Sequence, residues 1–572
     1  MHTKKILWRC DTITLQQETD MKMMEILRIL YTKNETLGAK LISEELKKRG
    51  YYLGERAVRY HMHMLDEKGF TEKVGYRGRK ITEKGLDELK KGLVYNQVDF
   101  TYTRFEEKMY KVTLDHITSN GSVIVNLSTI NDEMSKKVIE DFFKEGLTVS
   151  QRYNYYERND SMVIETVCGN TIDGIFQKNG IITKPLYGGL LKVEDYSPVM
   201  FTEQIAYEKT SVTPLEAFSG NDNTSVLDVA NSGTGVIPAN FRIIPASKKE
   251  DALKILDSLN KIGISGVIDV GNSGESVLGV PVPKDMVGIT IIGGVAPLCA
   301  AQEAGYDLNI KVADSFTEYG KMKSSKKYVD LPLKDCTKTN QQITFVLNRI
   351  FNLMSKVNFD VESSTGDVIT NISYVDKDSV DESLEIINNL YKNKPEYCIG
   401  NRYGIIDEGD KVGIATICSL TLDGILVNNG IPALPTYGGV LDISEDKQRF
   451  IELMSYTGSS LDPHEIFIKN NLHDIQGSLN NSGKILASVH SIPYVARDST
   501  IDILNKLNES GFEELCIGKT NEYMYNAKID KYHFGYVLAG GLNPIIAIKE
   551  KNINTDVKSI EKIMDYNTLE EL

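Results

Sequence analysis

The sequence predicts a mixed α+β and α/β protein, in which an N-terminal winged helix-turn-helix domain precedes two tandem copies of one α/β repeat. Two observations predict this fold class. One pattern of glycine, cysteine, aspartate, proline and tyrosine occurs twice, at a constant displacement of 250 residues. The first hundred residues follow another plan, with three helical patterns and then a short hairpin pattern. A chain of 572 residues also exceeds what one hydrophobic core usually supports, so three or more domains are expected.

The repeated pattern runs from a cysteine to a tyrosine that is followed by two glycines. In the first copy its positions are Cys168, Asp173, Gly174, Gly180, Pro185, Tyr187, Gly188 and Gly189. In the second copy they are Cys418, Asp423, Gly424, Gly430, Pro435, Tyr437, Gly438 and Gly439. Unrelated segments would not carry several residue types at identical spacings over such a length, so the pattern indicates an internal duplication.

The charge of the chain is divided unevenly between its head and its body. Residues 1–100 contain 20 Lys and Arg against 15 Asp and Glu, a net charge of +5, whereas the remaining residues contain 45 against 64, a net charge of −19. A basic head on an acidic body indicates that only the head contacts a polyanion such as DNA. An uneven but merely solvated surface is the alternative interpretation of this charge pattern.

The head has the order of elements of a winged helix-turn-helix domain. Helices are predicted over residues 21–34, 38–49, 55–68 and 83–93. A hairpin is predicted over residues 70–82, with a glycine-bracketed tip from Gly75 to Gly78, and Thr82 is expected to cap the helix that follows. We therefore place this domain at residues 21–95, after an extension of residues 1–20.

The third predicted helix has an apolar face and a basic face. Val58, Met62 and Leu65 are spaced to pack on the other helices. We expect the opposite face to enter the major groove of DNA and the hairpin tip to contact the flanking backbone or minor groove. The predicted DNA-binding residues are Arg56, Arg59, Tyr60, His63, Arg77, Arg79 and Lys80. A winged helix that binds another protein is the alternative.

The two repeats are placed at residues 106–335 and 340–550, with a polar connection at residues 95–105 before them and a C-terminal tail at residues 551–572 after them. Each half of the first repeat is interpreted as strand, helix, strand, strand, helix, strand, with one helix at residues 132–146. This order suits ferredoxin-like layers built from split βαβ units, in which helices cover one face of a sheet.

Glycine pairs at strand ends suggest sites for an anion. A strand that ends in glycines and turns into a helix exposes unpaired N–H groups at the positive end of the helix dipole. Gly293-Gly294 and Gly540-Gly541 occupy such positions, although the same glycines can serve tight turns without a ligand. Three basic residues occur in the first copy alone, so an anionic ligand would favour the first repeat. These residues are Lys178, Lys184 and Arg242.

The cysteine and aspartate of the repeated pattern also have structural interpretations. A nucleophilic thiol needs a positioned base, and neither His116 nor His464 recurs in the other copy. Cys168 is therefore expected in a pocket wall, and Asp173 is expected to cap the short helix that follows it. Tyr187, with the two glycines after it, is expected to line a cleft.

A winged helix followed by two copies of Cys-x4-Asp-Gly and Pro-x-Tyr-Gly-Gly resembles the archaeal nitrogen regulatory repressor family of methanogens, NrpR, over nearly the whole chain. The resemblance implies a transcriptional repressor of nitrogen fixation and assimilation genes that binds palindromic operator DNA as a homodimer. It also implies that 2-oxoglutarate binds the repeat region and releases the protein from DNA. Cys168 is by this resemblance the first candidate for the effector pocket, and Cys418 is the second. The predicted effector-binding residues are Cys168, Asp173, Tyr187, Gly188, Gly189, Gly293, Gly294 and Cys418.

No catalytic residue, metal site or resident cofactor is predicted. The seven cysteines never occur as a close pair, which argues against the usual zinc and iron-sulfur spacings, and reduced thiols are expected. A cysteine-dependent enzyme fused to a DNA-binding domain is the alternative from another class.

No apolar run approaches the ~20 residues that span a bilayer, and the first residues lack a signal-peptide pattern. A cytoplasmic protein with no membrane partner is therefore expected.

Overall fold

The computed structural model describes residues 15–33, 35–48, 51–91, 94–130, 147–158, 161–219, 223–324, 333, 336, 341–443, 448–518, 523–530 and 533–571. The chain divides into two compact units, one of Met1–Gln97, Asn352–Leu453 and Leu472–Leu572, and the other of Val98–Phe351 and Met454–Asn471. The first unit contains the head and most of the second repeat, and the second unit contains the first repeat. In the part of the chain that the structure describes, no helix is long and apolar enough to cross a membrane.

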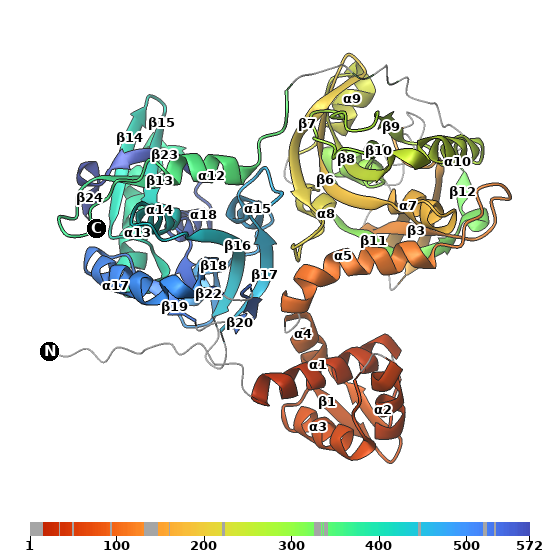
Figure 1. The fold of residues 1–572 in the computed structure, drawn as a ribbon, viewed down its shortest axis with the longest axis horizontal. Helices are drawn as coiled ribbons and strands as arrows, with labels where there is room; N and C mark the ends of the chain where they lie inside the picture. The colour runs from red at the N-terminus through yellow and green to blue at the C-terminus, as the bar shows by residue number, and fades with distance from the viewer. Residues whose placement is uncertain are drawn as a thin grey trace. The chain divides into compact units, whose positions relative to one another are not determined.

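The head is a winged-helix domain, drawn in red and orange in Figure 1. Its elements are α1 (Leu15–Lys33), α2 (Ala39–Lys48), α3 (Glu55–Glu67), β1 (Thr71–Val74), β2 (Gly78–Ile81) and α4 (Glu83–Lys91). The two strands pair antiparallel as the predicted hairpin, and the Gly85 N–H donates to the Thr82 hydroxyl at 3.0 Å, so the predicted cap is confirmed. The core of the head includes Ile26, Leu27, Leu30, Ile42, Leu46, Val58, Met62 and Leu65.

Two predicted boundaries of the head were wrong. The first helix begins at Leu15, so residues 15–20 of the predicted extension are helical. Residues 95–105 are not a polar connection, because they lie within α5 (Val94–Lys111). This helix buries Thr101, Phe105 and Met109, which are four residues apart and lie on one face. The charged and polar residues between them concealed the helical period in the sequence.

The first repeat contains two antiparallel five-stranded sheets. The strand orders are β11-β3-β5-β4-β12 and β7-β6-β8-β10-β9. The strands are β3 (Ser122–Ile130), β4 (Arg152–Arg158), β5 (Ser161–Val167), β6 (Lys184–Glu194), β7 (Ser197–Ala206), β8 (Gly235–Pro245), β9 (Val267–Val270), β10 (Met286–Ile292), β11 (Leu308–Glu318) and β12 (Lys323–Ser324). The helices that follow α5 in this repeat are α7 (Asn170–Lys178), α8 (Pro214–Phe218), α9 (Val226–Ser232), α10 (Lys249–Lys261) and α11 (Ala296–Glu303). The helix predicted at residues 132–146 lies outside the described residues.

The two halves of the repeat exchange their fourth strands. A ferredoxin-like unit has the strand order 4-1-3-2, so β6 would lie beside β3, and β11 would lie beside β8. Instead β11 pairs with β3, and β6 pairs with β8. Each sheet is therefore completed by a strand from the other half, and the strand that leads out of α7 becomes part of the opposite sheet. The predicted split βαβ layers are present, with this exchange added.

The second repeat has the same topology. Its sheets have the orders β23-β13-β15-β14-β24 and β17-β16-β18-β22-β19. The strands of these two sheets are β13 (Asp367–Asp376), β14 (Arg402–Glu408), β15 (Lys411–Ile417), β16 (Leu434–Ile443), β17 (Arg449–Ser455), β18 (Gly483–Pro493), β19 (Glu514–Ile517), β22 (His533–Ala539), β23 (Thr555–Asp565) and β24 (Glu570–Glu571), and β20 (Tyr523–Met524) and β21 (Ala527–Lys528) form a separate two-stranded sheet. Its helices are α12 (Val346–Met354), α13 (Val380–Asn393), α14 (Leu420–Asn428), α15 (Pro463–Lys469), α16 (Ile475–Ser478), α17 (Arg497–Leu507) and α18 (Asn543–Lys549).

The C-terminal residues belong to this sheet and are not a tail. β23 pairs with β13 over most of its length, and β24 pairs with β14. The prediction of a tail at residues 551–572 was therefore wrong. β23 corresponds to β11 of the first repeat and is the exchanged strand that completes a sheet, so its removal would leave β13 with an open edge.

Candidate functional site

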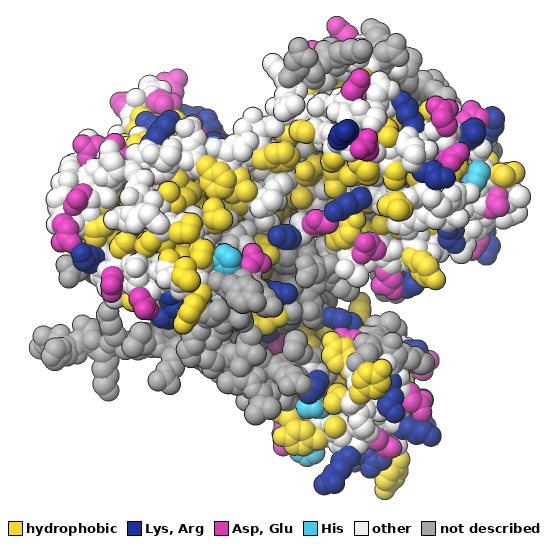
Figure 2. Space-filling model, viewed as in Figure 1, with side chains coloured by type: hydrophobic (Ala, Val, Ile, Leu, Met, Phe, Trp, Pro, Cys, Tyr) yellow, Lys and Arg dark blue, Asp and Glu magenta, His cyan; other side chains and the backbone are white. Residues whose placement is uncertain are grey.

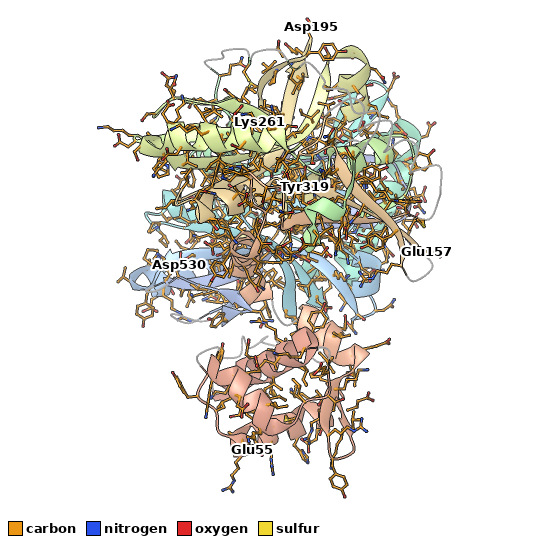
Figure 3. The ribbon with its side chains drawn as sticks, turned by 90° about the vertical axis from the view of Figure 1, so that its right-hand side faces the viewer. Glu55, Glu157, Asp195, Lys261, Tyr319 and Asp530 are labelled. Carbon is orange, nitrogen blue, oxygen red and sulfur yellow. The ribbon has the colours of Figure 1, made fainter. Side chains whose placement is uncertain are left out.

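The first candidate surface is the outer face of α3. Because Val58, Met62 and Leu65 are buried in the core of the head, the opposite side of the helix faces solvent. Its exposed residues include Arg56, Arg59, Tyr60 and His63. Lys and Arg side chains gather at the lower side of the head in Figure 2, where Figure 1 shows α3, and Figure 3 labels Glu55 at the start of this helix.

The polar neighbours of these residues lie on α3 itself. Arg59 forms an ion pair with Glu55, and the His63 ring lies 3.3 Å from Glu67. These pairs join exposed side chains, so their net contribution to stability is small. Phosphate groups of a nucleic acid could therefore replace the two glutamates at little cost.

The wing contributes residues of two kinds. Arg77 and Lys80 are exposed, whereas Arg79 forms an ion pair with Asp66 of α3 at 2.9 Å. The backbone of Arg79 also forms two 3.0 Å hydrogen bonds with Leu37, so Arg79 fixes the wing against the helices. The wing tip fully exposes Tyr76, which the sequence reasoning missed. The glycines that bracket the tip, Gly75 and Gly78, indicate from the sequence that Tyr76 lies at the wing tip.

The second candidate site lies where β5 leads into α7 of the first repeat. Asp173 is completely buried in the first half of α7, and Arg242, also completely buried, reaches it from β8 with an Nη1–Oδ2 distance of 2.8 Å. The same Nη1 donates to the Gly169 carbonyl at 3.3 Å, and the Thr183 hydroxyl donates to Asp173 Oδ1 at 2.6 Å. Asp173 is thus an ion-pair partner. The prediction that it caps α7 was wrong, because the helix has no side-chain cap.

Two residues of this site carry buried polar atoms without partners. Among the described residues, Arg242 Nε, Arg242 Nη2 and Asn170 Nδ2 are buried and have no hydrogen-bond partner. A Cβ atom added to Gly169 would lie 3.9 Å from Arg242 Nη2 and 3.6 Å from Asn240 Nδ2, so both side chains approach the start of α7. Unpaired buried donors are costly to a protein unless a ligand or water satisfies them.

The surroundings of the ion pair contain further polar groups. The Tyr207 hydroxyl donates to Asn240 Oδ1, and Gly188 leaves room for that hydroxyl, which would lie 3.3 Å from a Cβ at this position. Lys108 of α5 is close enough to Cys168 for an electrostatic interaction, and burial lowers the Lys108 pKa. The site therefore collects side chains from α5, α7, β8 and the segment after β7.

The Cys168 thiol is buried and protonated at neutral pH. Burial raises its pKa to about 11, against the opposing effects of the Asn170 N–H, Arg242 and Lys108. A nucleophilic cysteine needs a lowered pKa, so this environment favours the pocket-wall interpretation over the enzyme alternative. Five cysteines of the described part of the chain are free thiols, namely Cys168, Cys299, Cys336, Cys398 and Cys418.

The glycines of the predicted site mainly permit close packing. A Cβ on Gly189 would lie 2.2 Å from the Glu203 carbonyl oxygen, and one on Gly294 would lie 2.1 Å from the Val167 carbonyl oxygen. The Gly294 carbonyl also accepts from the Thr166 hydroxyl at 2.6 Å. Gly293-Gly294 is thus joined to the end of β5, next to Cys168, whereas no contact of Gly189 with the ion pair is seen among the described residues.

Tyr187 is separated from the ion pair by the alternation of side chains along a strand. It pairs with Phe241 across β6 and β8, and its ring lies 6.3 Å from the Phe241 ring and 5.8 Å from that of Phe345. Phe241 lies between Asn240 and Arg242 in β8, so its side chain points to the opposite face. Tyr187 therefore packs on the other side of the sheet from Arg242.

The second repeat has a different set of residues at the corresponding place. His490 occupies the position of Arg242, and its Nδ1 lies 2.7 Å from Asp423 Oδ2, although the two groups are poorly directed for a hydrogen bond. His490 Nε2 lies 2.7 Å from the Ser488 hydroxyl, and the Tyr536 hydroxyl donates to Asp423 Oδ1 at 2.5 Å. The His490 and Tyr536 rings are stacked at 4.9 Å. Cys418 thus lies beside a cluster whose polar groups face one another.

A winged-helix head joined to a duplicated α/β body, with a buried arginine–aspartate ion pair in one copy, is the organisation of a two-part regulatory protein. Comparison with known families gives the particular family. The NrpR regulatory domains NRD1 and 2 match residues 98–324 and 343–571, and the chain belongs to this family. The ribonuclease R winged-helix domain matches residues 24–89 of the head.

Two relatives match nearly the whole chain. The global nitrogen regulator NrpR of Methanocaldococcus jannaschii is 37% identical over 558 residues, which cover 97% of this chain and 98% of that protein. The global nitrogen regulator NrpR of Methanococcus maripaludis is 35% identical over 551 residues, which cover 96% and 98%. A crystal structure of a nitrogen repressor-like protein from Methanococcus jannaschii has 38% identity, a TM-score of 0.37, and covers 40% of this chain and 99% of its own.

Proposed function

We propose that this protein is a non-enzymatic, nitrogen-responsive repressor in the cytoplasm. In this proposal it binds palindromic operator DNA of nitrogen fixation and assimilation genes as a homodimer, and 2-oxoglutarate releases it. The names of the two near full-length relatives, both global nitrogen regulators, support the physiological role. The observation that carries the DNA-binding part is the exposed face of α3, where basic and aromatic side chains lie opposite the apolar face that forms the core.

The head can read DNA in the manner of other winged helices. Arg56 and Arg59 can contact guanine edges or phosphates in the major groove, while Arg77 and Lys80 contact the flanking backbone. Arg79 has another role, because its ion pair with Asp66 keeps the wing in position. One such head makes few base contacts, so a dimer on a palindromic site raises both affinity and specificity.

The body supplies a place for a small dianion. In the first repeat, Arg242 and Asn170 present buried donors at the start of α7, where the helix dipole also favours negative charge. An effector that binds one body conformation better than another shifts the protein toward that conformation. Release from DNA then requires that, in the favoured conformation, the two heads are placed so that they cannot both bind the operator.

Two measurements test the proposal. In gel-shift assays with operator DNA, the full chain should bind, and a chain that lacks residues 1–95 should not, while its circular dichroism spectrum shows a folded body. Calorimetry with 2-oxoglutarate should show binding, with glutamate and succinate much weaker. Equal binding of all three compounds would refute a specific sensor, and operator binding by the truncated chain would refute the role of the head.

A further inference from the structure

The wing of the head presents one aromatic side chain at its tip. Tyr76 lies in the turn between β1 and β2 and is fully exposed, with a relative exposure of 107%. The Arg77 N–H closes this turn by donating to the Val74 carbonyl oxygen at 3.1 Å. Gly75 and Gly78 have φ angles of +54° and +137°, which other residues rarely adopt, so the chain reverses sharply and leaves Tyr76 at its apex.

The wing is tied to α3 through both of its strands. Asp66 of α3 accepts from the Thr71 hydroxyl of β1 at 2.6 Å and from Arg79 Nε of β2 at 2.9 Å. The backbone of Arg79 also forms two 3.0 Å hydrogen bonds with that of Leu37. Tyr76 is three residues from Arg79, which is about 10 Å of extended chain. Because a major groove is about 12 Å wide, a tip on so short a tether reaches only the groove next to the one that α3 enters.

The charges of the wing fit the backbone of DNA. Lys73 and Arg77 on either side of the tip are exposed, and the five residues from Lys73 to Arg77 contain no acid. The one acidic residue of the two strands, Glu72, lies opposite Lys80 in the strand pair and away from the tip. Cations on both sides of the turn can bind phosphates on both sides of a groove. Such contacts place the Tyr76 ring between the two phosphate chains.

We propose that Tyr76 inserts its ring into the minor groove beside each half-site, partly unstacks one base step and bends the DNA. This inference rests on the proposed function, in which the head binds operator DNA. Large apolar side chains act as wedges in the minor groove and bend a duplex by about 20–90°. Pyrimidine–purine steps such as TA and CA unstack most easily. The protein therefore selects a flexible step where its wing lands, without hydrogen bonds to the bases of that step.

The first experiment lets the protein choose its own DNA. The full chain is used to select duplexes from a random-sequence library, and the bound duplexes are sequenced. The wild type should select half-sites with a pyrimidine–purine step at one constant distance outside each of them. Tyr76→Ala should select the same half-sites without a preference at that step, and Tyr76→Phe should keep the preference because it keeps the ring. Tyr110→Ala, which removes an exposed tyrosine of α5 outside the head, is the matched control.

The second experiment measures the bend and the affinity on one selected duplex. Fluorescence energy transfer between dyes on the two DNA ends should rise when the wild type or Tyr76→Phe binds, and it should rise much less with Tyr76→Ala. Replacement of the flexible step by GG should weaken wild-type binding by about tenfold. The same replacement should leave the affinity of Tyr76→Ala unchanged. Because Tyr76 is fully exposed, all variants should melt as the wild type does.

The possible results separate this inference from the proposed function. Selection of the same flexible step by Tyr76→Ala, or an unbent duplex in the wild-type complex, would overturn the wedge and leave operator binding standing. Loss of the step preference in Tyr76→Phe would also overturn it, because the hydroxyl and not the ring would then be responsible. A folded full chain that selects no sequence from the library would overturn the proposed function together with the wedge.

Discussion

At the scale of single residues, the two repeats show how one substitution changes what a buried aspartate requires. Asp173 and Asp423 occupy the same place, and each faces a basic side chain from the central strand of its sheet. The His490 imidazole bonds Ser488 through Nε2 and lies 2.7 Å from Asp423 through Nδ1, whereas the Arg242 guanidinium has five N–H groups and uses only those of Nη1. A buried ion pair adds little net stability by itself, so the unused Nε and Nη2 argue for a binding role.

The environment of Cys168 predicts a thiol that is inert in the folded protein. Burial raises its pKa to about 11, so at pH 7.5 almost none is thiolate, the form that reacts with alkylating agents. In the native protein, iodoacetamide should leave Cys168 unmodified at neutral pH, and in urea it should modify it fully, as read by peptide mass spectrometry. Rapid and stoichiometric labelling of the folded chain at pH 7.5 would revive the enzyme alternative.

Arg59→Ala should weaken binding to operator DNA by about tenfold or more, because it removes a base or phosphate contact worth ~1–3 kcal/mol. The side chain is exposed and pairs only weakly with an exposed glutamate, so the melting temperature should stay unchanged. Fluorescence anisotropy with labelled operator measures the affinity. Lys254→Ala, which removes an exposed cation of α10 in the first repeat, is the control and should bind DNA normally.

At the scale of elements, local patterns were easier to predict than partners distant in sequence. The hairpin and Thr82 cap of the head depend on residues a few positions apart, and these predictions are confirmed. The exchange of β6 and β11 was not predictable, because both strands fit either sheet by their alternation alone. The helix α5 was missed because its buried side includes Thr101, a polar residue that helical hydrophobic patterns do not count.

The burial of α5 gives a test within one helix. Phe105→Ala should destabilise the first repeat by about 3–5 kcal/mol, because Phe105 is buried and packs edge to face on Tyr207. Tyr110→Ala is the matched control on the same helix, and since Tyr110 is mostly exposed it should change little. In differential scanning calorimetry, the transition of the first repeat should occur at a lower temperature in Phe105→Ala than in the wild type. Equal melting of both variants would mean that α5 does not pack on the repeat.

Two glycines at the joined strand ends give a second test at this scale. Gly294→Ala would place a Cβ 2.1 Å from the Val167 carbonyl oxygen, and the backbone of β5 cannot move away cheaply. Gly169→Ser has room, with the nearest atoms 3.6 Å away, and the second repeat carries Ser419 at this place. We expect the alanine variant to lower the first-repeat transition or to prevent folding, and the serine variant to melt as the wild type does. A stable alanine variant would disprove the close approach of the two turns.

At the scale of the whole molecule, the duplication was visible in the sequence. The sequence showed only part of the difference between the two copies. The sequence marked Arg242 as a residue of the first copy, but it could not show that Asp173 binds it from 69 residues away in the chain. It also placed Tyr187 in the site, whereas strand alternation turns that ring to the opposite face. Motif spacing identifies which residues recur, and only the pairing of strands determines which of them meet.

The proposed release mechanism makes a quantitative prediction for the whole protein. If 2-oxoglutarate lowers the affinity for operator DNA by some factor, saturating operator DNA must lower the affinity for 2-oxoglutarate by the same factor, because the two binding steps share one thermodynamic cycle. Coupling of about 5- to 150-fold is typical of such proteins. Calorimetric titration with 2-oxoglutarate, with and without operator DNA, measures one side of the cycle, and anisotropy with and without 2-oxoglutarate measures the other. Arg59→Ala provides the control, since it should weaken DNA binding and leave the affinity of the free protein for 2-oxoglutarate unchanged. A protein that loses DNA on addition of 2-oxoglutarate, yet binds this effector equally well in the presence of saturating operator, would exclude release through one shared two-state equilibrium.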